Sequence, residues 1–356
     1  MSDPASAPRA SEPSQALADM TTLRVGGPAD RVVHAATDIE LIEAVTAADA
    51  VGEPLLLVGG GSNLLVADAG FRGTVLRIGT RGVLVEPSAP GRVRVRVSAG
   101  EPWEAFVATA VESGWSGVEA LSGIPGSTGA TPIQNVGAYG AEVARVIDSL
   151  EVLDRRTGAV GRMAPRDAEF GYRSSALKRT PGQWVVLAVT LDLAMDPMGA
   201  PVGYAELAAL LGVEIGDRAP MTAVREAVLE LRRGKGMVLD DSDRDTWSAG
   251  SFFTNPILSP AEAEALPDTA PRFAQPDGSV KTSAAWLISH AGFPRGYALH
   301  PGAPAALSTK HSLALTNRGG ATAEDLLEIA RAVRAGVAER FGIVLENEPV
   351  LVGCTL

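Results

Sequence analysis

Short apolar stretches alternate with amphipathic ones along most of the chain. The stretch 55–58 is continuously apolar, as expected of a buried strand, whereas residues 92–97 alternate Arg and Val. That alternation predicts a strand with an apolar face and a cationic face; the cationic face could bind an anion, although a solvated face is the simpler interpretation. The pattern predicts strands over residues 29–35, 54–58, 92–97, 149–153, 184–193 and 350–352.

Other segments carry apolar residues at helical spacing. Within residues 39–48 this period is set by Ile39, Ile42 and Val45, and Asp38 before them is the expected N-cap. The same spacing predicts helices over residues 38–49, 104–113, 221–233 and 323–340, with a polar turn region at 170–178. Strands and helices that alternate in this way predict an α/β or α+β fold.

The length and local composition indicate more than one domain. A chain of 356 residues is too long for one core, and about 150 residues per domain gives two or three. The Gly- and Asp-rich segment 234–250 resembles a crossing between domains. The first residues are rich in Ser, Pro and Ala without the apolar core of a signal peptide, so we expect a disordered tail over residues 1–15.

Charge and cysteine content narrow the class of protein. The formal net charge of -11 disfavours nucleic acid as a partner, because binding a polyanion needs a field of the opposite sign. The single cysteine, Cys354, excludes an intrachain disulfide and indicates a reducing, cytoplasmic compartment. No stretch reaches the roughly 18 apolar residues of a membrane span, so we expect no membrane association.

Two glycine-rich loops are candidates for binding a phosphate group. The turn 59–63 places Gly-Gly-Gly-Ser-Asn between apolar runs, so that successive N–H groups can converge on an anion. A plain hairpin turn explains this segment equally well, since it lacks the Lys-Ser/Thr ending of a P-loop. The loop 122–140, dense in Gly, Ser, Thr and Asn, offers many more amide and hydroxyl donors.

These loops and several other segments resemble, in sequence order, the UDP-N-acetylenolpyruvoylglucosamine reductase family of the vanillyl-alcohol-oxidase-like superfamily. The matching segments are 22–28, 59–64, 123–140, 171–174, 250–256 and 345–348. The resemblance implies an α+β fold with a two-part FAD-binding domain of the vanillyl-alcohol-oxidase-like type and a smaller α+β substrate-binding domain. It divides the chain into subdomains 16–85 and 86–233, a substrate-binding domain 234–345 and a returning C-terminal strand 346–356.

The resemblance also implies FAD as cofactor. Relatives that tether FAD covalently use His or Cys in the cofactor domain, where this chain has only His34, within a predicted strand, so we expect non-covalent FAD. The matching positions are expected to bind it: Gly59, Gly60, Gly61, Ser62, Asn63, Leu64, Ser122, Gly123, Ile124, Gly126, Ser127, Thr128, Gly129, Ala130, Gln134, Asn135, Gly137 and Ala138.

The implied reaction is NADPH-dependent reduction of UDP-N-acetylglucosamine enolpyruvate to UDP-N-acetylmuramate, a step of peptidoglycan precursor synthesis. The substrate's carboxylate gains charge and its C2 needs a proton, so the site requires a cation and an acid. Arg173 matches the cation and Ser251 the proton donor, while Glu348 orients Arg173 or polarises the substrate. Two alternatives remain open: Ser251 could be a capping serine, and Glu346, two residues from Glu348, could take its role.

For the UDP-sugar, the resemblance suggests Tyr172, Tyr204, Lys235, Asn255 and His311. Lys235 is a natural point charge for a diphosphate, whereas Tyr204 matches a mobile tyrosine loop but could also be a core residue. The basic residue that often follows the position of Glu348 is replaced here by Pro349, so a second cation at that edge of the site is either missing or supplied from elsewhere, for example by Arg24 or Lys281. No metal site and a monomer are expected.

Two other functions remain open from the sequence. A flavin-dependent sugar or alcohol oxidase would share the cofactor loops, but not Arg173, Ser251 and Glu348 together. A non-catalytic UDP-sugar or flavin-binding module would not depend on Ser251 at all. The combination of the three residues favours the reductase.

Overall fold

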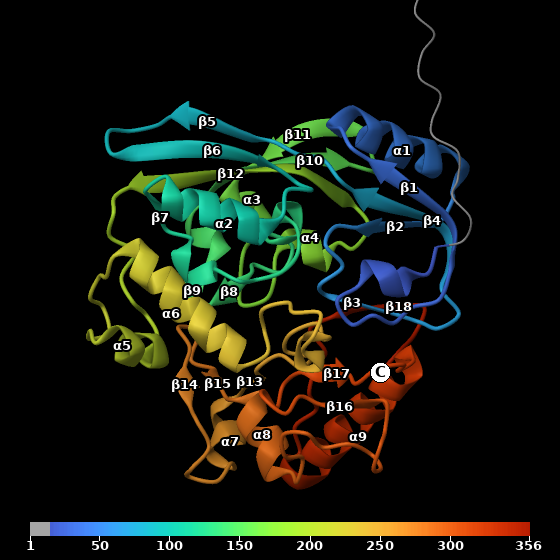
Figure 1. Cartoon of the computed structure of the whole chain (residues 1–356), viewed down its shortest axis with the longest axis vertical. Helices are drawn as coiled ribbons and strands as arrows, with labels where there is room; N and C mark the ends of the chain where they lie inside the picture. The colour runs from blue at the N-terminus through green and yellow to red at the C-terminus, as the bar shows by residue number, and fades with distance from the viewer. Residues whose placement is uncertain (1–14) are drawn as a thin grey trace, which may run out of the picture.

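The computed structural model describes residues 15–356, so nearly all of the predicted tail lies outside the described residues. The first sheet is parallel, with strand order β1-β4-β2, and helix α1 packs on it (Figure 1). The elements are β1 (Ala29–Ala35), α1 (Asp38–Val51), β2 (Leu55–Val58) and β4 (Phe71–Ile78). In parallel strands the carboxyl ends meet at one edge, which here lies next to the 59–63 turn.

Helix α1 differs from the sequence prediction in its N-cap and in its buried face. Its N-cap is Thr37, not Asp38, since the Thr37 side chain accepts from Glu40 N–H and Glu40 returns the bond in a capping box. Ile39 is 69% exposed. The buried positions are Leu41, Val45 and Ala48, spaced by four and three residues, so the face toward the sheet is rotated away from Ile39.

The second sheet is antiparallel, with order β11-β10-β12-β6-β5, and β7 pairs with β12. Its alternating strand is β6, whose valines are buried while Arg96 pairs with Asp38 and Glu151. The predicted cationic face is therefore neutralised by carboxylates. The strands are β5 (Val83–Pro87), β6 (Arg92–Ser98), β7 (Trp115–Ser116), β10 (Ile147–Asp154), β11 (Ala159–Met163) and β12 (Trp184–Met195), and helix α2 (Trp103–Glu112) shares their core.

In the C-terminal lobe, helix α9 (Ala323–Phe341) packs one face on the core, and its buried residues Leu326, Ile329, Ala330 and Val333 follow the helical period (Figure 1). Its other elements are β13 (Ile257–Leu258), α7 (Pro260–Glu264), β14 (Phe273–Ala274), β15 (Val280–Lys281), α8 (Ala284–His290), β16 (Ala305–Leu307) and β17 (Leu315–Asn317).

The chain end returns to the first lobe. Strand β18 (Val350–Val352) pairs in parallel with β3 (Leu64–Val66), directly after the glycine turn. Asp68, just beyond β3, accepts hydrogen bonds from the N–H groups of Ala323 and Glu324 and so helps to cap α9 across the two lobes. These contacts bring the end of the chain to the glycine turn 59–63.

The remaining elements lie between the lobes or around the 122–140 loop. They are β8 (Gly137–Ala138), β9 (Ala141–Glu142), α3 (Pro165–Ala168), α4 (Ala176–Arg179), α5 (Ala205–Leu211) and α6 (Met221–Gly234). Helix α4 begins within the predicted turn region 170–178. Across residues 15–356, none of the helices combines the length and the apolar character that crossing a bilayer requires.

Candidate active site

The two glycine-rich loops lie against each other. A Cβ on Gly59 would overlap the Ser127 hydroxyl oxygen, and one on Gly60 would lie 2.5 Å from the Cα of Gly126. The Ser62 hydroxyl donates to the Pro125 carbonyl at 3.1 Å. Residues larger than glycine would push the loops apart, which explains the glycines in terms of a shared surface rather than a hairpin turn alone.

The turn 59–63 presents free donors. In the described part of the chain, the N–H groups of these residues donate to no backbone or side-chain acceptor. Successive unpaired N–H groups form a nest that binds an anion. In the second loop several N–H groups already donate to main-chain carbonyls: Thr128 to that of Glu101, Gly129 to that of Ala99 and Ala130 to that of Ser127.

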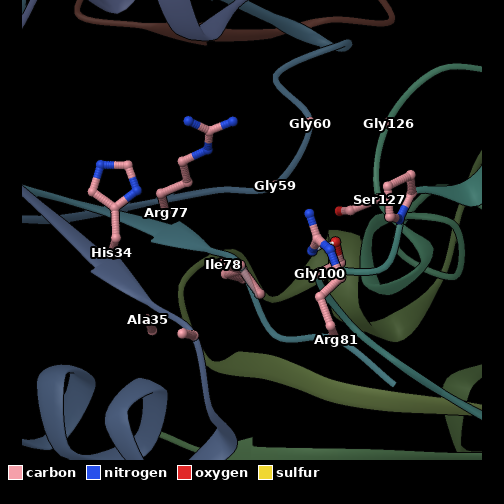
Figure 2. A pocket seen from close by; sticks show the side chains of 13 residues that line it. His34, Ala35, Gly59, Gly60, Arg77, Ile78, Arg81, Gly100, Gly126 and Ser127 are labelled. Atoms are coloured by element: carbon pink, nitrogen blue, oxygen red, sulfur yellow. Dashed lines mark hydrogen bonds between the residues drawn. The ribbon is translucent and has the colours of Figure 1, made fainter. Parts of the chain in front are cut away.

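A cavity of about 400 Å³ opens beside these loops (Figure 2). Besides Gly59, Gly60, Gly126 and Ser127, its lining includes residues that the sequence analysis missed: His34, Ala35, Ala36, Arg77, Ile78, Gly79, Arg81, Gly100 and Pro102. Several of these follow the carboxyl ends of the parallel strands, which is where ligands bind in such sheets. That rule, applied to the predicted strands, could have found them.

Arginine side chains frame this cavity. Arg77 pairs in register with His34 on the neighbouring strand, and both side chains lie at one end of the cavity in Figure 2. The Arg81 guanidinium donates to the main-chain carbonyls of Thr80 and Gly100 and so braces the other end. No carboxylate lines the cavity, so it suits an anionic ligand.

Other predicted cofactor residues use their polar groups inside the protein. The Ser122 hydroxyl donates to Glu119 O and accepts from Arg225, and Gly123 N–H donates to the Glu104 carboxylate. The Asn135 side chain makes hydrogen bonds with Glu142, Gly171 and Ala144. These groups therefore shape the loop. Ile124, Gln134, Gly137, Ala138 and Leu64 lie along the same two segments.

Arg173 and Glu348 form an ion pair, with 3.1 Å between Nε and Oε1 and side chains 21% and 13% exposed. The Arg173 guanidinium also donates to the carbonyls of Asn135 and Gly137 in the cofactor loop. Arg173 has a φ of 51°, a left-handed conformation that is uncommon outside glycine and often marks a functional position. Burial raises the pKa of Glu348, while Arg173 and Lys178 oppose this.

Main-chain pairing brings the segment that follows Ser251 beside the segment of Glu348. The carbonyl of Phe252 accepts from Glu348 N–H at 2.8 Å, and Thr254 N–H donates to Glu346 O at 3.0 Å. The two segments thus run side by side although they are far apart in sequence. Glu346 is exposed, and the arginine contact is made by Glu348.

Tyr172 forms a wall near the pair. Its ring lies 5.4 Å from the Arg173 guanidinium carbon and 4.7 Å from Lys281 Nζ. Burial raises the pKa of Tyr172, against the opposing effect of Arg173. Asn255 accepts from Ala284 N–H and so holds the start of α8 beside it.

A second polar cluster forms around Lys235, just after α6. Lys235 forms an ion pair with Glu206, and its Nζ lies 5.5 Å from the ring centre of Tyr139. Tyr204, the residue before α5, packs edge-on against Tyr139 with 5.4 Å between ring centres. Tyr204 is 43% exposed and is therefore not a core residue. Burial raises the pKa of Tyr139 to about 12.

His311 belongs to the same cluster. Burial, followed by the positive charges of Lys235, Arg295 and Arg232, lowers its pKa to about 4, and the negative charge of Glu206 opposes the shift. The imidazole is therefore neutral near pH 7. A region where several cations gather suits a ligand with more than one negative charge.

The two candidates for the missing basic residue differ in their surroundings. Arg24 pairs with Asp241 and lies 3.8 Å from the ring centre of Trp247. Lys281 instead lies over Tyr172, whose ring also faces Arg173. The structure therefore favours Lys281. His290 and His300 are exposed, and His290 stacks on Trp286.

The residues fit a dinucleotide flavin. The free amides of the turn 59–63 can hold a pyrophosphate, the adjoining cavity has room for part of a nucleotide, and the Arg173 side lies beyond the second loop. This fold and site define an FAD-dependent oxidoreductase.

Comparisons with known proteins agree. A model described as "FAD binding domain" matches residues 29–164, and one described as "UDP-N-acetylenolpyruvoylglucosamine reductase, C-terminal domain" matches residues 241–352. The protein of that name from Streptomyces coelicolor is 54% identical, covering 96% of this chain and 90% of the relative. The one from Cutibacterium acnes is 53% identical with the same coverage.

A solved structure is also similar. The crystal structure of UDP-N-acetylenolpyruvylglucosamine reductase from Thermus caldophilus has a TM-score of 0.64 and 28% identity, covering 96% of this chain and 98% of that one. The chain belongs to the UDP-N-acetylenolpyruvoylglucosamine reductase family. The family, the α+β fold and the FAD-dependent oxidoreductase class expected from the sequence are confirmed.

Proposed function

We propose that Arg173, Ser251 and Glu348 carry out the reaction of this family in the present chain. The chain is a reductase of UDP-N-acetylglucosamine enolpyruvate that uses FAD and NADPH in peptidoglycan precursor synthesis. The observation that carries the residue assignment is the buried Arg173–Glu348 pair, which lies beside the segment of Ser251 and against the cofactor loop.

Arg173 binds and polarises the substrate carboxylate. Its Nε faces Glu348, and Nη1 and Nη2 each donate to a carbonyl of the loop. Because each of these terminal nitrogens carries two N–H groups, one on each remains for the substrate, in the fork that matches a carboxylate. The fixed guanidinium stabilises the charge that develops there during reduction. FAD, when bound, supplies the hydride carrier between NADPH and the enolpyruvyl double bond.

Ser251 supplies the proton to C2, and Glu348 holds Arg173 in place. A serine hydroxyl is a weak acid, so it donates only as negative charge forms on the carbon next to it. Glu348 is buried, which places its negative charge where screening by water is weak and fixes the guanidinium firmly. Glu346 is exposed and has no part in this assignment.

The cluster around Lys235 binds the UDP part of the substrate. Lys235 and the nearby arginines offer positive charge to the diphosphate, and neutral His311 can donate or accept a hydrogen bond. The exposed ring of Tyr204 closes over the ligand and excludes water. Tyr172 and Asn255 line the path from this cluster to Arg173.

The cavity of His34, Arg77 and Arg81 holds the adenosine side of FAD, and the free amides of the turn 59–63 hold the pyrophosphate. This assignment follows from position, since Arg173, Ser251 and Glu348 are not among the cavity residues, and the flavin ring must reach them. The cofactor is non-covalent. The proposal takes the protein as a monomer, and the lone Cys354 supports the cytoplasm.

Anaerobic spectroscopy tests the function. NADPH should bleach the flavin bands of the purified protein, and UDP-N-acetylglucosamine enolpyruvate should restore them. Ser251→Ala should keep the bleaching and lose most of the recovery, whereas Ser279→Ala, a partly exposed serine of the same lobe whose hydroxyl donates to Asp277, should behave as wild type. Recovery by oxygen alone, with no response to the substrate, would instead indicate an oxidase.

A further inference from the structure

The side-chain amide of Asn63 joins two parts of the site. Its Nδ2 donates to Oε1 of Gln134 at 2.9 Å and to the main-chain carbonyl of Glu348 at 3.3 Å. The carbonyl of Asn63 accepts from Val350 N–H at 2.9 Å. Because a main-chain carbonyl only accepts, the NH₂ end of the amide must face Glu348. One residue of the glycine turn thus makes hydrogen bonds with the residues on both sides of Pro349, Glu348 and Val350.

The main chain of Glu348 is held from two directions. Its N–H donates to the carbonyl of Phe252, the residue after Ser251, and its carbonyl accepts from Asn63. Its carboxylate faces Arg173. Each of these three partners comes from a different segment. A shift of the Asn63 contact would therefore move the carboxylate relative to both Arg173 and the Ser251 segment.

The turn that carries Asn63 is a firm support. Gly60 packs directly against Gly126, and the Ser62 hydroxyl is bonded to Pro125 O. Directly after the turn, Leu64 pairs with Val350 as β3 meets β18. These contacts fix the position of the Glu348 segment relative to the turn, whose free amides face the cofactor in the proposed function. Small displacements of catalytic groups lower the reaction rate strongly.

We infer that Asn63 is a positioning residue of the reaction, acting through Glu348 rather than touching the substrate. Its amide sets the distance between the flavin, held by the backbone of the turn, and the Arg173–Glu348 pair. This inference rests on the proposed function. It assigns the Asn63 side chain to the geometry of substrate reduction, and leaves the backbone N–H of the same residue for the cofactor.

The experiment compares the two half-reactions in the FAD-loaded enzyme by anaerobic stopped flow. Asn63→Ala should retain the flavin spectrum and be reduced by NADPH within about twofold of the wild-type rate. Reoxidation by UDP-N-acetylglucosamine enolpyruvate should slow by about tenfold at saturating substrate, because the lost hydrogen bond frees Glu348. The pH profile of reoxidation should shift, since the Arg173–Glu348 contact changes. Asn63→Asp, nearly identical in shape, should give the same pattern because its carboxylate cannot donate.

Gln275→Ala is the matched control, because it removes a side-chain amide that donates to the carbonyls of Phe273 and Ala274 and not to Glu348. It should leave both half-reactions unchanged. Equal slowing of both half-reactions in the two Asn63 variants, or lost FAD affinity with an unchanged reoxidation rate and pH profile, would overturn the inference. If wild-type reduced enzyme fails to react with the substrate, the proposed function fails instead.

Discussion

Arg173 and Glu348, far apart in the sequence, meet with 3.1 Å between Nε and Oε1 in the interior of the protein. The guanidinium is fixed by this carboxylate and by two carbonyls of the cofactor loop. In the proposed function, the substrate carboxylate therefore binds an arginine that is already oriented, which lowers the cost of organising the site during the reaction.

Replacing Arg173 by lysine tests whether the two parallel donors of the guanidinium are needed, rather than its positive charge alone. Arg173→Lys keeps the charge but loses the planar pair of donors, so reoxidation by the enolpyruvyl substrate should slow by about 100-fold while reduction by NADPH persists. Arg179→Lys is the control and should have no effect. Arg179 is partly exposed at the end of α4 and forms an ion pair with Glu169, the residue after α3. An active Arg173→Lys enzyme with wild-type reoxidation would show that charge alone is enough.

Gly61→Ala should abolish FAD retention. Gly61 has a φ of 62°, and a Cβ there would overlap the carbonyl oxygen of Met20, so the turn must move. Gly52→Ala is a close control, because Gly52 has a φ of 67° with no atom within 4 Å of the added Cβ. It should cost about 1 kcal/mol of unfolding free energy and keep the flavin. The absorbance of bound flavin after gel filtration distinguishes the two variants, and a yellow Gly61→Ala protein would contradict the assignment of the turn.

Arg77→Ala should weaken FAD binding by about tenfold and leave FMN binding unchanged, since only FAD carries the adenosine side placed in the cavity. Arg72→Ala, on the same strand but paired with Asp30 at the surface, is the control. Flavin fluorescence quenching by apoprotein gives both affinities. Equal losses for FAD and FMN would move Arg77 to the part of the site that both flavins share.

Glu206→Gln should lower the KM for the UDP-sugar. The Glu206 carboxylate forms an ion pair with Lys235. The diphosphate therefore has to displace this carboxylate from Lys235 and is repelled by its negative charge. Glu43→Gln, an exposed position on α1 with the same change of net charge, separates this local effect from a general one. Steady-state kinetics at several salt concentrations measure it, and a raised KM would mean that Glu206 helps to orient Lys235.

His311 should make the protein less stable as the pH falls. Its pKa of about 4 lies below the ordinary 6.5, so the unfolded state binds an extra proton between these values. The stabilising contribution is complete above pH 6.5 and declines toward pH 4, by roughly 2 kcal/mol between pH 6.5 and pH 5. His311→Gln should remove this part of the pH dependence in urea unfolding, whereas His300→Gln, an exposed histidine, should keep it. Parallel curves for wild type and His311→Gln would refute a buried neutral imidazole.

The sequence by itself determined the local elements and the order of the motifs. Periodicity marked β1, β18 and α9 to within a residue, because a buried face repeats at the period of its own element. It did not mark the N-cap of α1 or its buried face, because Ile39 and Leu41 are both apolar and only packing on the sheet selects between them.

The tertiary structure decided which groups are free to act. Sequence named both glycine loops, but not that the amides of the turn 59–63 are unpaired while those of Thr128 and Gly129 are used. Nor could it separate Glu348 from Glu346, or find Asn63's bond to Glu348. The reason is physical: a polar group can bind a ligand only if no other part of the chain satisfies it, and those partners come from segments distant in sequence.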